Sequence, residues 1–91
     1  GLEDVRMGID GIDAEIIRLL GKRMGYVLKA ADFKPDEASI PAPDRVARML
    51  PARRGWAEKA NLDPDFIVPL YSQIIQWFIQ QQIKFYKSRS S

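Results

Sequence analysis

The sequence contains neither histidine nor cysteine, and these two absences exclude several classes of chemistry. Without cysteine there is no disulfide framework and no thiol nucleophile. Without histidine the chain lacks the usual zinc ligand, the base of a catalytic triad and the side chain that titrates near neutral pH. An enzyme built from this chain therefore has to work with arginine, lysine, glutamine, carboxylates and the shape of its pocket.

Long apolar runs and a strong charge of one sign are also missing. No stretch approaches the roughly 18 consecutive apolar residues of a membrane-spanning helix, and no signal-peptide pattern opens the chain. We therefore expect no membrane association and a cytoplasmic location. The net charge is only +2 and both signs are interspersed, which does not favour a nucleic-acid partner. A length of 91 residues predicts one small domain, residues 1–91.

The first thirty or so residues, Gly1–Ala31, predict one long amphipathic helix. Positions spaced by three or four residues form a single stripe along it: Val5, Ile9, Ile12, Ile16, Leu19, Arg23, Val27 and Ala30. Arg23 interrupts an otherwise apolar stripe, and a guanidinium is rarely buried without an anionic partner. That partner is either a carboxylate of the protein or a ligand.

The length of this helix also predicts an assembly. Thirty helical residues span about 45 Å, whereas a globule of this size has a radius of gyration near 12–13 Å. The remaining residues cannot cover such a helix along its whole length. One alternative is a protruding end. The apolar stripe favours the other, an obligate helical dimer in which a second copy covers the helix.

The rest of the chain predicts a loop and two further helices. Residues 32–43 contain three prolines and no helical period, which is typical of a loop of about ten residues. Pro43 suits the start of a second helix, which we expect Pro51 to interrupt or kink. Asp63-Pro64-Asp65 combines an N-cap, a first-turn proline and a carboxylate that suits the helix dipole. A third helix is expected from there to about Lys87, so the predicted fold is all-α, long-short-long.

The residues after Pro51 are expected to be exposed. Arg53, Arg54, Glu58 and Lys59 are predicted to form a solvated surface around Trp56. Asn61 suits a left-handed residue just after the helix.

Four polar side chains could together bind a small dianion: Arg6, Arg23, Lys34 and Gln82. Each arginine can hold a carboxylate through two parallel N–H bonds, and glutamine can donate a hydrogen bond without adding charge. Ordinary alternatives exist for three of them. Arg6 could pair with Asp10 at the surface, Lys34 could be solvated, and Gln82 could satisfy a backbone carbonyl.

With these residues in place, the sequence resembles a known enzyme family. The segments VRMGIDGIDAEIIRLLGKRMGYVLKAADFK, IPAPDRVARMLP and IIQWFIQQQIK resemble the small all-helical chorismate mutases of the AroQ class. The run FK…IPAPDRV resembles more closely the isochorismate-pyruvate lyases of salicylate and pyochelin siderophore synthesis. The resemblance covers nearly the whole chain.

The resemblance implies an intertwined homodimer with two shared active sites between the long helices. It implies that Arg6 binds a substrate carboxylate in the partner's site and Arg23 binds one in its own. Lys34, on a mobile loop, would meet the ether oxygen and a carboxylate, and Gln82 would hydrogen-bond near the same oxygen. Other implied pocket residues are Val27, Arg45, Met49 and Ile79.

Three positions depart from a family pattern. Val46 stands where the mutases have a glutamate that accepts a hydrogen bond from the ring hydroxyl of chorismate. Loss of this acceptor favours isochorismate, whose hydroxyl lies elsewhere on the ring, because an unpaired buried polar group costs roughly 1–3 kcal/mol. Phe78 stands where a lyase of this type has tyrosine, and Pro69 adds a bend to the third helix.

The implied activity is the lyase reaction, conversion of isochorismate to salicylate and pyruvate. This pericyclic elimination needs no cofactor and no metal. Two alternatives stay open: chorismate mutase activity, as the main or a secondary reaction, and a non-catalytic helical module whose apolar stripes dock a partner helix.

Overall fold

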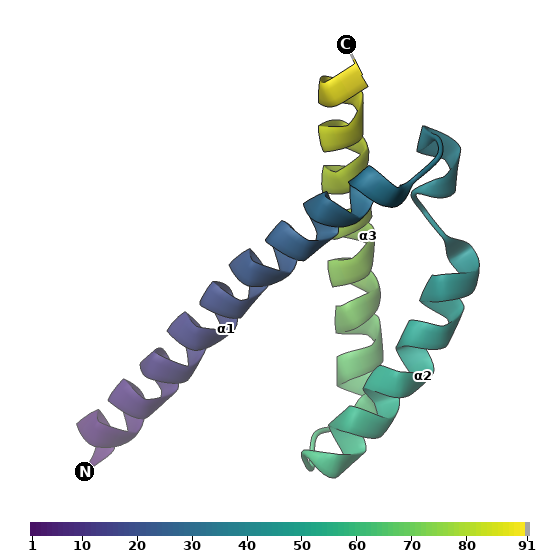
Figure 1. Cartoon of the computed structure of the whole chain (residues 1–91). Coiled ribbons are helices and arrows are strands. Elements are labelled where there is room, and N and C mark those ends of the chain that lie inside the picture. Colours follow the sequence, from purple (N-terminus) through teal and green to yellow (C-terminus); the bar gives the residue numbers. More distant parts are fainter. Residues whose placement is uncertain (91) are drawn as a thin grey trace.

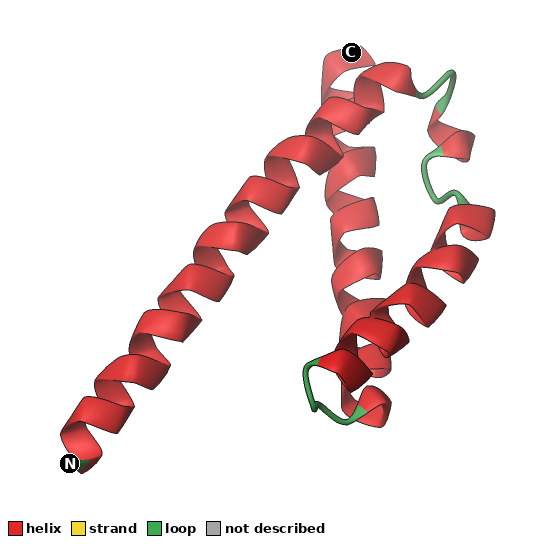
Figure 2. Ribbon diagram, turned by 60° about the horizontal axis from the view of Figure 1, so that its bottom comes forward, coloured by secondary structure: helices red, strands yellow, loops and turns green. Residues whose placement is uncertain are grey.

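The computed structural model describes residues 1–90, which form three helices in the predicted long-short-long order. These are α1 (Leu2–Ala30), α2 (Pro43–Lys59) and α3 (Pro64–Ser90) (Figure 1). Two single 3₁₀ turns, Ala31–Phe33 and Glu37–Ser39, lie between α1 and α2 (Figure 2). The described residues contain no strand, and none of their helices is long and apolar enough to cross a membrane. The all-α prediction is confirmed.

Helix α1 extends well beyond the other two helices. Its N-terminal end points away from α2 and α3, and only its C-terminal part crosses α3 (Figure 1). The chain is accordingly elongated, with a radius of gyration of 16.2 Å and a longest dimension of 55 Å. The apolar stripe is present as predicted, but Val5, Ile9, Ile12 and Ile16 are each half or more exposed. A single chain leaves this stripe in water.

The core lies where α2, α3 and the end of α1 meet. It is small, and its buried apolar residues are Ala31, Ile40, Met49, Ala57, Ile75 and Phe78. No residue of α1 itself is fully buried. The packing that holds the chain together is therefore mainly between α2 and α3, which lie side by side in both views (Figures 1 and 2).

The connection between α1 and α2 is more ordered than the predicted structureless loop. The Asp36 carboxylate accepts a hydrogen bond from the Ser39 N–H at 2.9 Å and caps the second 3₁₀ turn. Two ion pairs then join the connection to the end of α3: Arg89 with Asp32, and Lys87 with Glu37 at 3.4 Å. Local polar capping, which the proline count did not reveal, explains this difference.

The predicted helix starts and ends are largely confirmed. Helix α2 begins at Pro43, and the Asp63 carboxylate accepts a hydrogen bond from the Asp65 N–H at 2.8 Å where α3 begins. Asn61 has a φ of 58°, so the left-handed residue after α2 is confirmed.

Of the two outcomes expected for Pro51, interruption or a kink of α2, interruption was wrong. The helix continues through this residue to Lys59. Pro51 is exposed, as is Ala47, whose carbonyl loses its helical hydrogen-bond donor to the proline ring. Water can satisfy that carbonyl, and the packing of the opposite face against α3 maintains the helix. Pro69 likewise lies inside α3 without ending it.

Candidate anion-binding site

A cavity of about 600 Å³ lies between the C-terminal part of α1, the α1–α2 connection, α2 and the middle of α3. Its lining includes five cationic side chains and no carboxylate: Lys22, Arg23, Lys34, Arg45 and Arg53. Apolar side chains complete the wall. A cavity with this charge fits a compact anion that carries more than one negative group.

Arg23 lies in this cavity as a half-buried cation without a protein anion. Its guanidinium packs over the ring of Phe78, with Cζ 4.4 Å from the ring centre. One of its nitrogens, Nη1, is buried and has no hydrogen-bond partner among the described residues. Burial lowers the pKa of Arg23, and the nearby charges of Arg53 and Arg45 lower it further. The first alternative raised by the sequence, a carboxylate of the same chain, is therefore not realised within the described residues.

Lys34 lies at the edge of the same cavity. It follows the first 3₁₀ turn in an extended conformation and is half-buried. Its Nζ lies 3.5 Å from the Ser39 carbonyl oxygen, a long hydrogen bond. The ammonium group has three N–H donors, so most of its capacity is available to a ligand.

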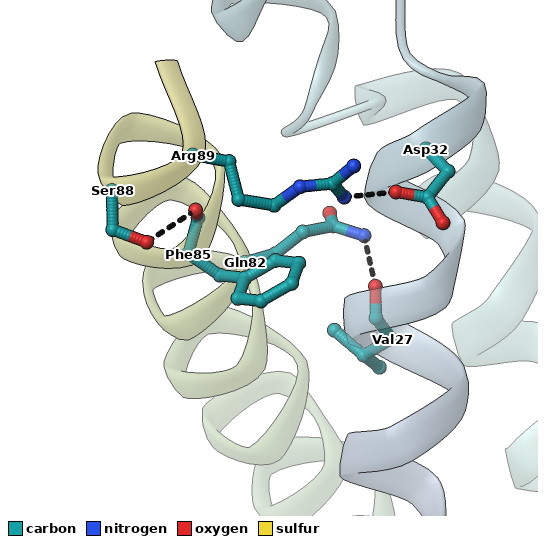
Figure 3. Close-up of polar contacts among 6 residues, drawn as sticks. All are labelled: Val27, Asp32, Gln82, Phe85, Ser88 and Arg89. Carbon is teal, nitrogen blue, oxygen red and sulfur yellow. Dashed lines mark hydrogen bonds and ion pairs between the residues drawn. The ribbon is translucent and has the colours of Figure 1, made fainter. Parts of the chain in front are cut away.

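Gln82 is buried against the end of α1. Its side chain is on α3, and its Nε2 donates a hydrogen bond to the Val27 carbonyl oxygen at 2.6 Å (Figure 3). The ordinary alternative, that Gln82 satisfies a backbone carbonyl, is thus correct. The residue also lines the cavity, however. An amide has two N–H donors, and the bond to Val27 fixes its orientation while leaving one donor over.

The remaining expected pocket residues also line the cavity. Val27, Met49 and Ile79 contribute apolar wall, and Arg45 lies exposed at the rim. Val46, at the position of the mutase glutamate, is half-buried in the same wall. Phe78, buried beneath Arg23, contributes to the floor of the pocket.

Arg6 is the one expected site residue that lies outside the cavity. It is near the free end of α1, its side chain is 61% exposed, and it pairs with Glu3 at 3.0 Å. The predicted surface partner, Asp10, was wrong. An interval of three residues along the helix suits this ion pair as well as an interval of four does.

Arg53 is a cavity residue that the sequence analysis missed. It was expected on a solvated surface around Trp56, but it is half-buried and lines the cavity. A signal was available: Val46, Met49 and Arg53 are spaced by three and four residues, so Arg53 continues the apolar face of α2. Arg23 continues the apolar stripe of α1 in the same way.

The described residues contain no group of three or more histidine, cysteine, aspartate or glutamate side chains that could hold a metal ion. Fold and cavity together define a class: a small all-helical protein with a cavity lined by cationic and apolar side chains. Residues 5–83 match the family described as chorismate mutase type II. The chain belongs to this family.

Two curated proteins illustrate the relationship. The chain is 53% identical over 87 residues to the isochorismate pyruvate lyase of Pseudomonas aeruginosa, covering 96% of this chain and 86% of that protein. It is 42% identical over 67 residues to the T-protein of Haemophilus influenzae, covering 72% of this chain but only 18% of that much longer protein. The resemblance stated from the sequence is confirmed.

Proposed function

We propose that this protein is an isochorismate-pyruvate lyase with a secondary chorismate mutase activity. The observation that carries the proposal is the cavity lined by five cations and no carboxylate, in a chain 53% identical to an isochorismate pyruvate lyase. Isochorismate is a compact dianion with two carboxylates and an ether oxygen. A cationic pocket with apolar walls suits both its charge and its ring.

The reaction is a concerted elimination in which atoms are only redistributed. A hydrogen leaves the ring for the CH₂ carbon of the enolpyruvyl group while the bond between the ring and the ether oxygen breaks. The ring becomes the aromatic ring of salicylate, and the departing oxygen becomes the keto oxygen of pyruvate. No nucleophile is needed. Catalysis comes from holding the reactive conformer and from stabilising negative charge on the breaking ether oxygen.

Lys34 and Gln82 are proposed to act at that ether oxygen. Both line the cavity, and each keeps at least one N–H donor beyond its bond within the chain. Arg23 is proposed to bind a substrate carboxylate and so fix the reactive conformer. Its unpartnered Nη1 and its position over Phe78 support this role. Val27, Met49 and Ile79 contact the ring, and Arg45 closes the rim.

The proposed active form is an intertwined homodimer. The uncovered stripe of α1 supports it, since exposed apolar patches of this extent mark association surfaces. A second copy packed along α1 brings its own Arg6 to the cavity, where it binds the second carboxylate. We further propose that residues 1–91 form a single domain of chorismate mutase type and that the enzyme is cytoplasmic.

One assay tests the activity. Isochorismate and chorismate are supplied separately to the purified protein, and salicylate fluorescence is followed against the formation of prephenate. We expect salicylate and pyruvate in equal amounts from isochorismate, and slower prephenate formation from chorismate. Faster turnover of chorismate would make the protein a mutase. No turnover of either would favour the non-catalytic helical module.

A further inference from the structure

Arg53 lies in the cavity but has no role in the function proposed above. It follows Met49 by one helical turn on α2, so its side chain extends along the face that packs against α3. The next residue, Arg54, faces outward and pairs with Asp65 at 3.6 Å. Two adjacent arginines on one helix therefore have different surroundings, one at the surface and one in the pocket.

The Arg53 guanidinium is held in place by three contacts. Its Nη1 donates to the Met49 carbonyl oxygen at 3.3 Å. Its Cζ lies 4.8 Å from the ring centre of Trp56 and 5.4 Å from that of Tyr71. Since the aromatic rings come from two different helices, the group is oriented before any ligand binds. Such preorganisation reduces the entropy lost on binding.

These contacts orient the Arg53 charge without neutralising it. Arg53 has no ion pair among the described residues, and its Nε is buried without a hydrogen-bond partner. Arg23 lines the same cavity, and the positive charge of Arg53 contributes to lowering the pKa of Arg23. Two like charges half-buried in one cavity raise the energy of the empty protein, and an anion placed between them offsets that cost.

We propose that Arg53 binds a carboxylate of the dianionic ligand together with Arg23, so that two guanidinium groups of one protomer hold one carboxylate. This inference rests on the proposed function for the identity of the ligand, isochorismate. The contacts of Arg53 on α2 keep its positive charge at a fixed place relative to Arg23 on α1. Binding of the carboxylate therefore ties α1 to α2 across the cavity.

The test compares Arg53→Gln with Arg54→Gln, which removes the same charge one residue away. We expect Arg53→Gln to raise KM for isochorismate about 10- to 100-fold, the scale of a lost charged hydrogen bond, while kcat changes much less. An interaction made equally in ground and transition states acts on KM in this way. Arg53→Lys should restore part of the loss, and Arg54→Gln should leave KM unchanged.

A second measurement separates this inference from the proposed activity. Calorimetric titration with benzene-1,3-dicarboxylate, a stable dianion that cannot undergo the elimination, reports binding without turnover. Weaker binding by Arg53→Gln than by Arg54→Gln supports the inference even if isochorismate is not turned over. Equal binding by the two variants would overturn it, and so would a KM for Arg53→Gln within twofold of the wild-type value.

The dimer supplies the last control. Sedimentation of Arg53→Gln at the concentration of the assay should give the same species as the unsubstituted protein. If this variant instead dissociates, Arg53 pairs with a second copy rather than with the ligand, and the inference is wrong. Arg53→Lys keeps the charge, so it provides a folded variant for the titration should the glutamine variant not fold.

Discussion

At the scale of single residues, the cavity is defined by charges that the chain does not neutralise. Arg23 and Arg53 each keep one buried nitrogen without a partner among the described residues, and no aspartate or glutamate lines the pocket. An unsatisfied buried polar group costs roughly 1–3 kcal/mol. In the proposed complex, one ligand carboxylate bound by both guanidinium groups would recover that energy. If the proposal is correct, the empty protein is less stable than the complex by this amount.

Lys34→Ala tests the proposed stabilisation of the ether oxygen. Removing one preorganised donor from a transition state costs about 100-fold in kcat or more. We expect a loss of this size, with a smaller change in KM, in steady-state assays with isochorismate. Lys29→Ala removes an exposed charge at the end of α1 and should leave kcat unchanged. Near wild-type turnover by Lys34→Ala would remove Lys34 from the mechanism.

Arg23→Leu tests whether the arginine serves binding rather than folding. Replacement of a poorly paired buried charge by an apolar side chain is often neutral or stabilising. We expect an unfolding free energy that is unchanged or raised by about 1 kcal/mol in urea titrations, together with loss of turnover. Destabilisation beyond about 2 kcal/mol would instead make Arg23 a structural residue. Unchanged turnover would exclude it from the site.

Sequence patterns located some site residues and not others, for physical reasons. The position of Arg23 on an apolar stripe indicates a site residue, and Arg53 lies on the apolar face of α2 in the same way. Lys34 and Gln82 share a cavity because of the way α1 crosses α3. The periodicity of the apolar residues does not specify how two helices cross. Arg6 lies outside the cavity of the single chain, and its proposed place in a site requires a second copy.

At the scale of elements, ion pairs join the end of α3 to the connection that carries Lys34. The pairs Arg89–Asp32 and Lys87–Glu37 join the last turns of α3 to the two 3₁₀ turns. Exposed ion pairs contribute only about 0.2–1 kcal/mol each, so they bias the position of the connection without locking it. We therefore expect the connection to shift when a ligand enters.

Asp32→Asn removes one of these pairs and tests this arrangement. We expect kcat to fall about twofold to fivefold, since a bias of up to 1 kcal/mol in the position of Lys34 is lost. Raising the salt concentration should also lower kcat of the unsubstituted protein, because salt screens the attraction between these exposed charges. The control is Glu58→Gln, which removes an exposed carboxylate on α2. Equal kcat for both variants would show that the pair does not position Lys34.

The end of α2 offers a test that is independent of activity. Asn61 adopts a left-handed conformation with φ 58°, which costs a side chain with a Cβ about 1–2 kcal/mol and asparagine less. Asn61→Ala should lower the unfolding free energy by about 1 kcal/mol, whereas Asn61→Gly should not lower it. Denaturant titration measures both. If the two variants have equal stability, this backbone position is not strained.

At the scale of the whole molecule, the chain has more apolar surface than it can bury. The helix boundaries of α1 and α3 and the long-short-long order followed from periodicity and from the Asp63 cap. The angle at which α1 leaves the other helices did not, because it depends on which surfaces pack. The uncovered stripe of α1 is the surface that we propose a second copy to cover.

Complementation tests the shared site directly. Arg6→Ala and Arg23→Ala are each expected to abolish activity in homodimers. The two variants are mixed in equal amounts, unfolded and refolded together. Half of the resulting dimers then contain one chain of each kind. Each mixed dimer then has one site with both arginines intact, so about a quarter of wild-type activity should return. An inactive refolded mixture would show that Arg6 and Arg23 do not serve one site from two chains.

The uncovered stripe of α1 also makes the stability of the proposed dimer depend on dilution. When folding and association are one step, the concentration of folded dimer at equilibrium depends on the square of the concentration of unfolded chains. Each tenfold dilution therefore removes about 1.4 kcal/mol from the free energy that favours folded dimers. The amount of protein present is then itself a determinant of how much of it is folded.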